Sequence, residues 1–368
     1  MRSQKNYDAI VVGGGLVGSA IAYGLSRQNL SVALLDEGDL AFRASRGNFG
    51  LVWVQSKGDG MPQYAQWTRR SADLWPEFAE ELNGVLGLDI GYRKPGGLAF
   101  CMSDQEFEDK QTMLERMRQT VPGGYDFQMI GRNRLKEMLP EIGGKVVGAS
   151  YCPHDGHVNP LYLLRALHKA IQGQVDYSPN TTINRIERHE NIFTAETVEG
   201  PVRAPKLVLA AGLGNRELAP QVGLQVPVSP LRGQILITER LKHFLDMPTI
   251  YVRQVEEGGV MMGDSHEDVG FDTSTTVDIS RSIAQRAISY FPKLADANLV
   301  RTWGALRVMT PDGHPIYDQS DSHPGAYVAT CHSGVTLAAV HARDLATAIA
   351  RDSLPDEVGK FTAERFNV

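Results

Sequence analysis

Three glycines and an acidic residue near the start of the chain have the types and spacing that bind a dinucleotide. Gly13, Gly15 and Gly18 form the pattern G-x-G-x-x-G, and Asp36 follows roughly 20 residues later. Such glycines permit a tight turn and a close approach of the backbone to a pyrophosphate, and the acid holds a ribose hydroxyl. The helix that follows the turn supplies an anion site at its N-terminus. We predict that a dinucleotide contacts Gly13, Gly15, Leu16, Val17, Gly18, Asp36 and Glu37.

The flanking residues favour a folded β-α-β unit over an isolated turn. Residues 10–12 predict a buried strand, apolar residues at helical spacing over 20–25 predict a helix, and residues 31–35 predict the next strand. The apolar stretch 8–25 could also be the hydrophobic region of a signal peptide, but the glycines and Asp36 fit a fold better than a cleavage site. The motif alone leaves nicotinamide and flavin dinucleotides open.

Length and composition limit the remaining classes. A chain of 368 residues exceeds what one core usually organises, so we expect two lobes. The net charge of -6 provides no basic stripe for nucleic acid and no polybasic membrane patch. Cys101, Cys152 and Cys331 are widely spaced, so we expect no metal site and no iron–sulfur cluster in this chain. No apolar run is long enough to predict a transmembrane segment, and we expect a cytoplasmic protein.

The order of the predicted elements indicates two lobes that are interleaved along the chain. The β-α-β unit is followed by a small, polar loop over 44–50, which can lay its backbone against a flat ligand, and by a helix over about 63–83. Residues 91–144 look like an insertion, and residues 226–300 are rich in strands. Residues 175–186 and 193–198 predict paired strands, residues 206–212 a strand, residues 303–307 and 326–330 two more, and residues 337–350 a helix.

We therefore predict a mixed α/β fold. A Rossmann-like nucleotide domain is expected over 1–90, 145–225 and 301–368, interleaved with an antiparallel-sheet substrate domain over 91–144 and 226–300. Within the third segment, Arg307 is flanked by apolar Ala305, Leu306, Val308 and Met309. A guanidinium in such a dry setting needs a charged partner, which is either a substrate carboxylate or a carboxylate of the protein.

Over nearly its whole length the sequence resembles the FAD-dependent D-amino acid oxidase family, which includes glycine oxidase and sarcosine oxidase. The matching motifs are VVGGGLVGSAIAYGL at the start, AS-x-x-N-x-G at 44–50, DGHVNP at 155–160, VLAAG at 208–212, LRGQ at 231–234, ALR at 305–307 and HSG-x-T at 332–336. Each motif is weak alone, and together they are specific. The resemblance implies a glycine oxidase-like fold with FAD extended across the nucleotide domain and its flavin ring at the junction of the lobes.

The resemblance also assigns residues to the cofactor. Ala44, Ser45, Arg46, Asn48, Phe49, Gly50 and Leu51 would line the pyrophosphate and flavin, the backbone of Ile183 would meet the adenine, and Ala211 and Gly212 would close the site. Ile183 could equally be a core residue of a strand. The N–H groups of Gly334, Val335 and Thr336 at the start of the last helix would stabilise negative charge on the N1/O2 edge of the flavin. Ala305 stands where sarcosine oxidases carry a flavin-linked cysteine, so noncovalent FAD is implied.

For the substrate, the resemblance implies that Arg307 binds a carboxylate together with the hydroxyl of Tyr251. His266 and His332 are further candidates for the catalytic site, each of which could instead be structural. Arg253 could face substrate or a partner. The implied reaction removes hydride from the carbon beside an amine nitrogen and delivers it to flavin N5, with no obligatory acid–base pair.

Within the family, WVQSKG at 53–58 and YVRQ-x-x-x-GGV at 251–260 resemble the small flavin subunits of heteromeric dehydrogenases such as opine oxidase, hydrogen cyanide synthase and D-hydroxyproline dehydrogenase. This implies an amino acid or opine substrate, and partner subunits that carry an iron–sulfur cluster and a second nucleotide site, with FMN at an interface. Such partners could hold the protein at the inner membrane. Met261 aligns with the oxygen-activating lysine of sarcosine oxidases, which suggests poor oxygen reactivity. A stand-alone amine oxidase that makes hydrogen peroxide and a non-catalytic FAD-binding subunit stay as alternatives.

Overall fold

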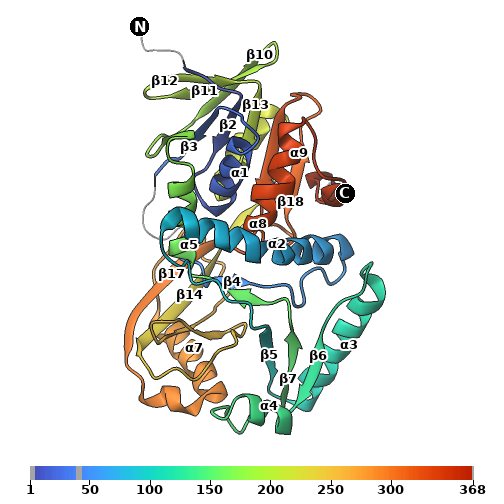
Figure 1. Ribbon diagram of the computed structural model, residues 1–368, viewed down its shortest axis with the longest axis vertical. Helices are drawn as coiled ribbons and strands as arrows, with labels where there is room; N and C mark the ends of the chain where they lie inside the picture. Colours follow the sequence, from blue (N-terminus) through green and yellow to red (C-terminus); the bar gives the residue numbers. More distant parts are fainter. Residues whose placement is uncertain (1–4, 39–43, 367–368) are drawn as a thin grey trace.

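The computed structural model describes residues 5–38 and 44–366, which form two lobes stacked along the long axis (Figure 1). A six-stranded sheet in the order β18-β19-β13-β2-β3-β9 organises the upper lobe. Its strands are β2 (Ala9–Val12), β3 (Val32–Leu35), β9 (Val175–Ser178), β13 (Lys206–Leu209), β18 (Ile316–Gln319) and β19 (Ala326–Thr330). The four inner strands are buried along their whole length. This explains their nearly continuous apolar sequences, because a parallel sheet is covered on both faces.

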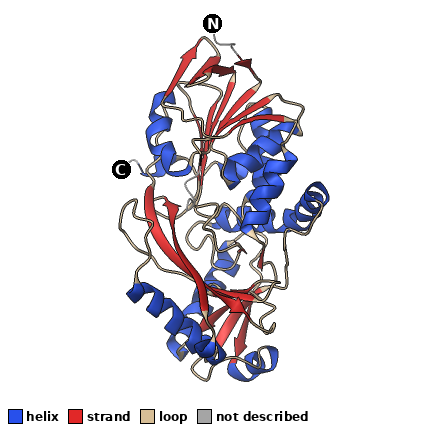
Figure 2. Ribbon diagram, turned by 90° about the vertical axis from the view of Figure 1, so that its left-hand side faces the viewer, coloured by secondary structure: helices blue, strands red, loops and turns tan. Residues whose placement is uncertain are grey.

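Helices cover one face of this sheet and a second sheet covers the other (Figure 2). The helices are α1 (Leu16–Ser26), α5 (Pro160–Ala170) and a C-terminal helical run of α8 (Ala338–Val340), η4 (His341–Leu345) and α9 (Ala346–Ala350). The second sheet has the order β1-β12-β11-β10, with β1 (Lys5–Asn6), β10 (Arg185–His189), β11 (Ile192–Thr197) and β12 (Gly200–Ala204). Gly24 lets α1 touch the C-terminal run, since a Cβ there would lie 2.3 Å from the Ala342 carbonyl oxygen.

The lower lobe contains two antiparallel sheets that share one core. The first has the order β15-β16-β14-β17, with β14 (Ser229–Arg240), β15 (Val252–Gln254), β16 (Gly259–Met262) and β17 (Leu299–Met309). The second has the order β5-β7-β6, with β5 (Gly97–Cys101), β6 (Gln128–Gly131) and β7 (Gly148–Cys152). Helices α3 (Asp104–Thr120), α4 (Arg132–Met138) and α7 (Val277–Tyr290) pack on these sheets.

Between the lobes run the long helix α2 (Pro62–Leu86) and the short strand pair of β4 (Leu51–Val52) and β8 (Gly156–His157). Shorter helical segments complete the chain: η1 (Gly212–Gly214), α6 (Asn215–Leu218), η2 (Ala219–Val222), η3 (Pro292–Asp296), η5 (Asp356–Val358) and η6 (Ala363–Phe366). No helix among the described residues is both long and apolar enough to span a bilayer.

The mixed α/β architecture predicted from the sequence is confirmed, with three corrections. The single strand predicted over 175–186 is wrong: β9 ends at Ser178 beside β3, Asn180 has φ +59°, and the chain re-enters a different sheet as β10. Strand β7 pairs with β5, and β17 pairs with β14 as far as Met309. Residues 148–152 and 301–309 therefore belong to the sheets of the lower lobe, and the proposed domain division shifts accordingly.

Candidate functional site

The glycine turn between β2 and α1 is packed so closely that side chains cannot enter it. Gly13 has φ +107°, and a Cβ there would lie 2.4 Å from the Ala210 carbonyl oxygen and 2.8 Å from Cα of Ala211. A Cβ on Gly18 would lie 1.8 Å from the carbonyl oxygen of Gly13. The glycines therefore let β2, α1 and the end of β13 approach one another closely, as in turns that accommodate an extended pyrophosphate at a helix start.

Two polar side chains gather at this turn. The Asp36 carboxylate accepts hydrogen bonds from Gly14 N–H at 2.6 Å and from Gly38 N–H at 3.0 Å. The Ser45 hydroxyl accepts from Leu16 N–H at 3.0 Å, which caps the first turn of α1. Both contacts bring predicted cofactor residues to the N-terminal end of α1, and Glu37 follows Asp36 directly.

The residue expected at the adenine, Ile183, lies in the extended segment between β9 and β10. Its side chain is buried in the core between the two sheets of the upper lobe. The same segment joins the turn through Thr181, whose N–H donates to the Asp36 carbonyl oxygen at 2.6 Å. Ile183 is thus a core residue in the segment that contacts Asp36 through Thr181, and its contact with adenine stays a prediction.

The loop over 44–50 crosses from the upper lobe to β17 of the lower lobe. Trp303 donates from Nε1 to the Gly47 carbonyl oxygen at 3.2 Å, and a Cβ on Gly47 would lie 2.3 Å from the Ala305 methyl group. Asn48 accepts from Gly50 N–H at 2.7 Å, and Gly50 has φ +88°. Contacts within the loop and with β17 therefore fix the conformation of the segment that joins the glycine turn to the lower lobe.

A cavity of about 380 Å³ lies where this loop, β17 and the start of the C-terminal helical run meet. Its wall includes eight of the predicted site residues: Ala44, Asn48, Phe49, Leu51, Arg307, His332, Val335 and Thr336. It also includes Trp53, Gln55, Ser56, Lys57, Asp264, Ala305 and Ser333. Elements from both lobes thus enclose one space in front of the predicted flavin-binding segments.

Arg307 lies in the wall of this cavity, and its charge is already paired. Its Nη2 lies 2.7 Å from Asp264 Oδ2, and its Nη1 donates to the Ser265 carbonyl oxygen at 2.8 Å. Burial lowers the pKa of Arg307, and the Asp264 carboxylate opposes that shift. The internal ion pair considered for Arg307 is therefore present, and carboxylate binding stays a prediction.

The other predicted substrate residues, Tyr251, His266 and His332, differ in their contacts and in their exposure. Tyr251 stacks beneath the Arg286 guanidinium, which lies 4.1 Å from its ring centre, and it is not among the residues that line the cavity. His266 is largely exposed, with Nε2 3.8 Å from Asp264 Oδ2. His332 is exposed and lines the cavity. Desolvation by the surrounding protein and the positive charges of Lys57 and Arg307 lower its pKa well below 6.5.

Arg253 does not face substrate or a partner, and that expectation is wrong. Its side chain is buried beneath the loop over 44–50, where it donates to the Phe49 carbonyl oxygen and contacts His157 Nδ1 at 3.2 Å and Met261 Sδ at 3.1 Å. Burial lowers the pKa of Arg253 to about 10. The guanidinium therefore supports the loop from below.

At the start of the C-terminal helical run, three backbone N–H groups have no acceptor among residues 5–38 and 44–366, and two of the three residues line the cavity. The first helical hydrogen bond runs from Leu337 N–H to the Ser333 carbonyl oxygen at 3.0 Å, so the N–H groups of Gly334, Val335 and Thr336 precede it. A Cβ on Gly334 would lie 3.5 Å from Val17 Cγ2, which places this start beside the first turn of α1. Ala211 and Gly212 follow β13 on the far side of the glycine turn, and Ala211 N–H donates to Asn215 Oδ1 at 2.9 Å.

Sequence reasoning missed two charged residues near the cavity. Lys57 donates from Nζ to Ser333 Oγ at 2.7 Å, and burial lowers its pKa to about 8. Asp155 is completely buried and accepts from the N–H groups of Val54 at 2.6 Å and Gln55 at 3.1 Å. Both lie in quoted motifs, WVQSKG and DGHVNP, but neither motif states which way its charged side chain points.

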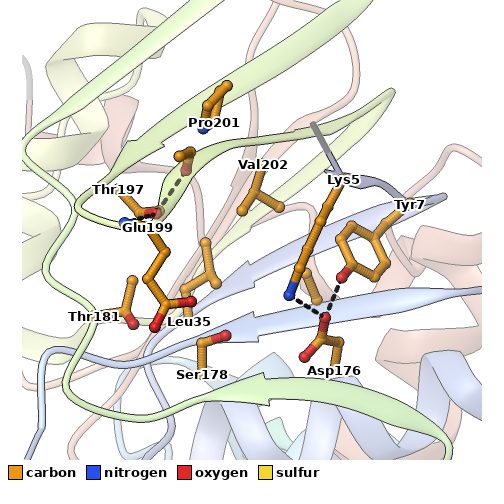
Figure 3. Close-up of a pocket in the computed structure, with 12 residues that line it drawn as sticks. Lys5, Tyr7, Leu35, Asp176, Ser178, Thr181, Thr197, Glu199, Pro201 and Val202 are labelled. Carbon is orange, nitrogen blue, oxygen red and sulfur yellow. Dashed lines mark hydrogen bonds and ion pairs between the residues drawn. The ribbon is translucent and has the colours of Figure 1, made fainter. Parts of the chain in front are cut away.

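A second cavity, of about 250 Å³, lies in the upper lobe and shares no lining residue with the first (Figure 3). Lys5 and Tyr7 both contact the Asp176 carboxylate there, and Glu199 and Thr181 lie on the other side of the space. None of the residues predicted for cofactor or substrate lines it. Within 5–38 and 44–366 no group of three or more His, Cys, Asp or Glu side chains is arranged to hold a metal ion.

Comparisons with known proteins place the chain among relatives of similar length. The chain is 43% identical over 362 residues to a subunit of opine oxidase from Agrobacterium tumefaciens (strain Ach5), covering 98% of each chain. It is 29% identical to hydrogen cyanide synthase subunit HcnC of Pseudomonas protegens, covering 98% of this chain and 97% of that one. The crystal structure of glycine oxidase from Geobacillus kaustophilus superimposes with a TM-score of 0.89 at 24% identity, over 97% of this chain and 98% of the other.

The family model described as DAO, FAD dependent oxidoreductase, matches residues 8–348. That range contains the glycine turn, both lobes, the cavity and most of the C-terminal helical run. The chain belongs to the DAO family of FAD-dependent oxidoreductases.

Proposed function

We propose that this protein is the flavin subunit of a heteromeric dehydrogenase that oxidises the C–N bond of an amine carrying a carboxylate. The substrate class comprises opines, D-amino acids and cyclic amino acids such as proline or hydroxyproline. Hydride would pass from the carbon beside the nitrogen to N5 of noncovalent FAD, and the electrons would continue to partner subunits.

The observation that carries this proposal is the position of Arg307. Its guanidinium lies in the wall of the cavity that also contains the loop over 44–50 and the helix start at Gly334–Thr336. An arginine can bind a carboxylate through two parallel hydrogen bonds, which orients an amino acid as well as holding it. The 43% identity to the opine oxidase chain supports an opine-like substrate.

The residues present fit FAD at both ends of the proposed site. The glycine turn and Asp36 would hold the pyrophosphate and ribose, and the free N–H groups of Gly334, Val335 and Thr336 would meet the flavin edge that becomes negative. The bound flavin supplies the electron-accepting chemistry. Ala305 lines the cavity with a methyl group, which offers no atom for a covalent link.

The partner subunits are part of the proposal. Relatives at 43% and 29% identity are both described as subunits. We expect partners with an iron–sulfur cluster and a second nucleotide site, with FMN at an interface, in the cytoplasm or held at the inner membrane through those partners. Copurification of the chain with such partners, analysed for FAD, FMN and iron, tests this part.

Anaerobic reduction followed by air tests the reaction itself. The purified FAD-loaded protein is mixed with a panel of opines, D-amino acids, sarcosine and both proline isomers, and flavin absorbance is followed. We expect rapid bleaching with one class and slow return of absorbance in air. Bleaching by no amine would favour a non-catalytic FAD-binding subunit.

The second candidate function is a stand-alone amine oxidase. The superposition with glycine oxidase at a TM-score of 0.89 favours it as far as a shared fold can. In the same experiment this candidate requires hydrogen peroxide to form at the rate of aerobic turnover. Met261, at the position considered for oxygen activation, is buried against Arg253 and does not line the cavity.

A further inference from the structure

Lys57 is held at one end of the cavity by a fixed set of contacts. Its Nζ donates to Ser333 Oγ at 2.7 Å, and the Tyr64 hydroxyl donates to the same oxygen at 2.8 Å. The amine also lies 5.9 Å from the centre of the Tyr64 ring. Ser333 directly precedes Gly334, so this amine is attached to the helix start that offers its free N–H groups to the cavity.

The loop that carries Lys57 is fastened to the same helix start at a second point. Trp53 N–H donates to Thr336 Oγ1 at 3.0 Å, and the buried Asp155 carboxylate fixes the next two residues through Val54 N–H and Gln55 N–H. The loop and the helix start therefore form one unit. Residues 53 and 57 reach Thr336 and Ser333, and the N–H groups of Gly334 and Val335 lie between these contacts in sequence.

The charge of Lys57 has no ion-pair partner among the residues that the structure describes, whereas that of Arg307 is paired with Asp264. Lys57 is half-buried, and an ammonium ion that is partly removed from water without a paired carboxylate is stabilised when another negative charge comes close. Asp155 acts on Lys57 through space, but its hydrogen bonds point to the loop backbone and to the Gln55 amide. A negative charge placed at the helix start would lie beside the ammonium group.

We propose that Lys57 stabilises the negative charge of the reduced flavin at the helix start Ser333–Thr336 and so raises the reduction potential of the bound FAD. The helix start provides partial charges from its N–H groups, and the ammonium group adds a full positive charge to the same end. This inference rests on the proposed position of the flavin but not on the amine substrate.

A redox titration without substrate tests the inference. The FAD-loaded wild type and the Lys57→Met variant are each equilibrated anaerobically with a reference dye. We expect the equilibrium constant for reduction to fall about tenfold or more in Lys57→Met, which corresponds to about 30 mV for a two-electron couple. Lys57→Arg should retain most of the wild-type value, because it keeps the charge.

Lys110→Met is the matched control. Lys110 is also a half-buried lysine with a lowered pKa, and its Nζ lies 3.5 Å from the hydroxyl of Ser56, the neighbour of Lys57, but it does not line the cavity. Its replacement should leave the potential unchanged. Ser333→Ala provides a second variant, with a smaller shift in the same direction, if Lys57→Met does not retain FAD.

Two results would overturn the inference. One is a wild-type potential in FAD-loaded Lys57→Met and Ser333→Ala. The other is an equal shift in Lys110→Met, which would indicate a general effect of buried charge. Failure of every amine to reduce the wild type would contradict the proposed function and leave this titration interpretable.

Discussion

Arg307 and Asp264 form an ion pair in the cavity wall, with Nη2 2.7 Å from Oδ2. The other oxygen of the carboxylate, Oδ1, is buried without a hydrogen-bond partner in the described residues. A substrate carboxylate that approaches Arg307 must therefore lie close to a second negative charge. We therefore expect Asp264 to weaken binding of simple anions and to favour substrates that also carry a positive group.

Substitution of Asp264 should separate these effects. We expect Asp264→Asn to tighten binding of a simple carboxylate inhibitor by about tenfold, roughly 1.4 kcal/mol, because a like charge is removed. Arg307→Ala should weaken it by about 30-fold or more, with little loss of FAD. Perturbation of the flavin spectrum measures both dissociation constants. Weaker inhibitor binding in Asp264→Asn would contradict the repulsive role.

The Lys57 ammonium should link reduction to proton uptake. Burial lowers the pKa of Lys57 to about 8, and negative charge on reduced flavin would raise it, so above about pH 8 reduction should take up one extra proton per two electrons. Of the neighbouring groups, Asp155 has a pKa of about 7 and so titrates mostly below pH 8, Cys331 has a pKa of about 12, the pKa of Tyr64 is raised, and those of His314 and His332 are lowered. Between pH 8 and 10 the reduction potential should fall more steeply with pH in the wild type than in Lys57→Met.

The substitution Gly334→Ala tests the position of the flavin without a steric clash in the folded protein. A Cβ there would lie 3.5 Å from its nearest neighbour, Val17 Cγ2, so the apoprotein should accept Gly334→Ala with its unfolding free energy nearly unchanged. A methyl group at a flavin edge should nevertheless lower FAD affinity. Calorimetry of apoprotein and FAD titration check the two expectations. Full FAD affinity in this variant would place the flavin elsewhere.

Gly18→Ala should behave differently from Gly334→Ala. Its Cβ would lie 1.8 Å from the Gly13 carbonyl oxygen, so the turn must move and both stability and FAD binding should fall. Gly84→Ala within α2 is the control, since a Cβ there meets nothing within 4 Å. It should stabilise the protein by about 0.5–1 kcal/mol, because alanine is favoured over glycine inside a helix. Equal FAD affinity in both variants would argue against the turn as the cofactor site.

Asp155 should make stability depend on pH with an unusual sign. Burial raises the pKa of Asp155 from 3.8 to about 7, although its hydrogen bonds oppose the shift. Between about pH 4 and 7 the folded state therefore binds more protons than the unfolded state, so the unfolding free energy should fall as pH rises. Urea unfolding should show this loss, on the order of a few kcal/mol, in the wild type and not in Asp155→Asn. Parallel pH curves for the two proteins would contradict it.

Local patterns were sufficient to predict the β-α-β unit, because β2, α1 and β3 are adjacent in sequence and the spacing of their apolar residues and glycines indicates how they pack. The same patterns failed at residues 175–186, where both halves have strand composition but Asn180 turns the chain between two sheets. Strand β17 was assigned to the nucleotide domain with the rest of residues 301–368. Its partner β14 lies about 70 residues earlier, and no local pattern indicates that the two strands pair.

Side-chain partners were harder to predict than elements. Arg307 was expected in a dry pocket, and it lies half-buried in the cavity wall, but its pairing with Asp264 depends on a contact 43 residues away. Arg253 has an equally apolar neighbourhood and lies under the loop. Lys57 has the sequence context of an ordinary polar residue in a loop, and its contact with Ser333, 276 residues later, has no local signal.

The close approach of Gly47 to Ala305 couples the side-chain sizes that the two lobes can accept at these positions. A Cβ on Gly47 would lie 2.3 Å from the Ala305 methyl group, so neither position can gain volume unless the other segment withdraws. Exchanging lobes between relatives should therefore succeed only when both segments are transplanted together.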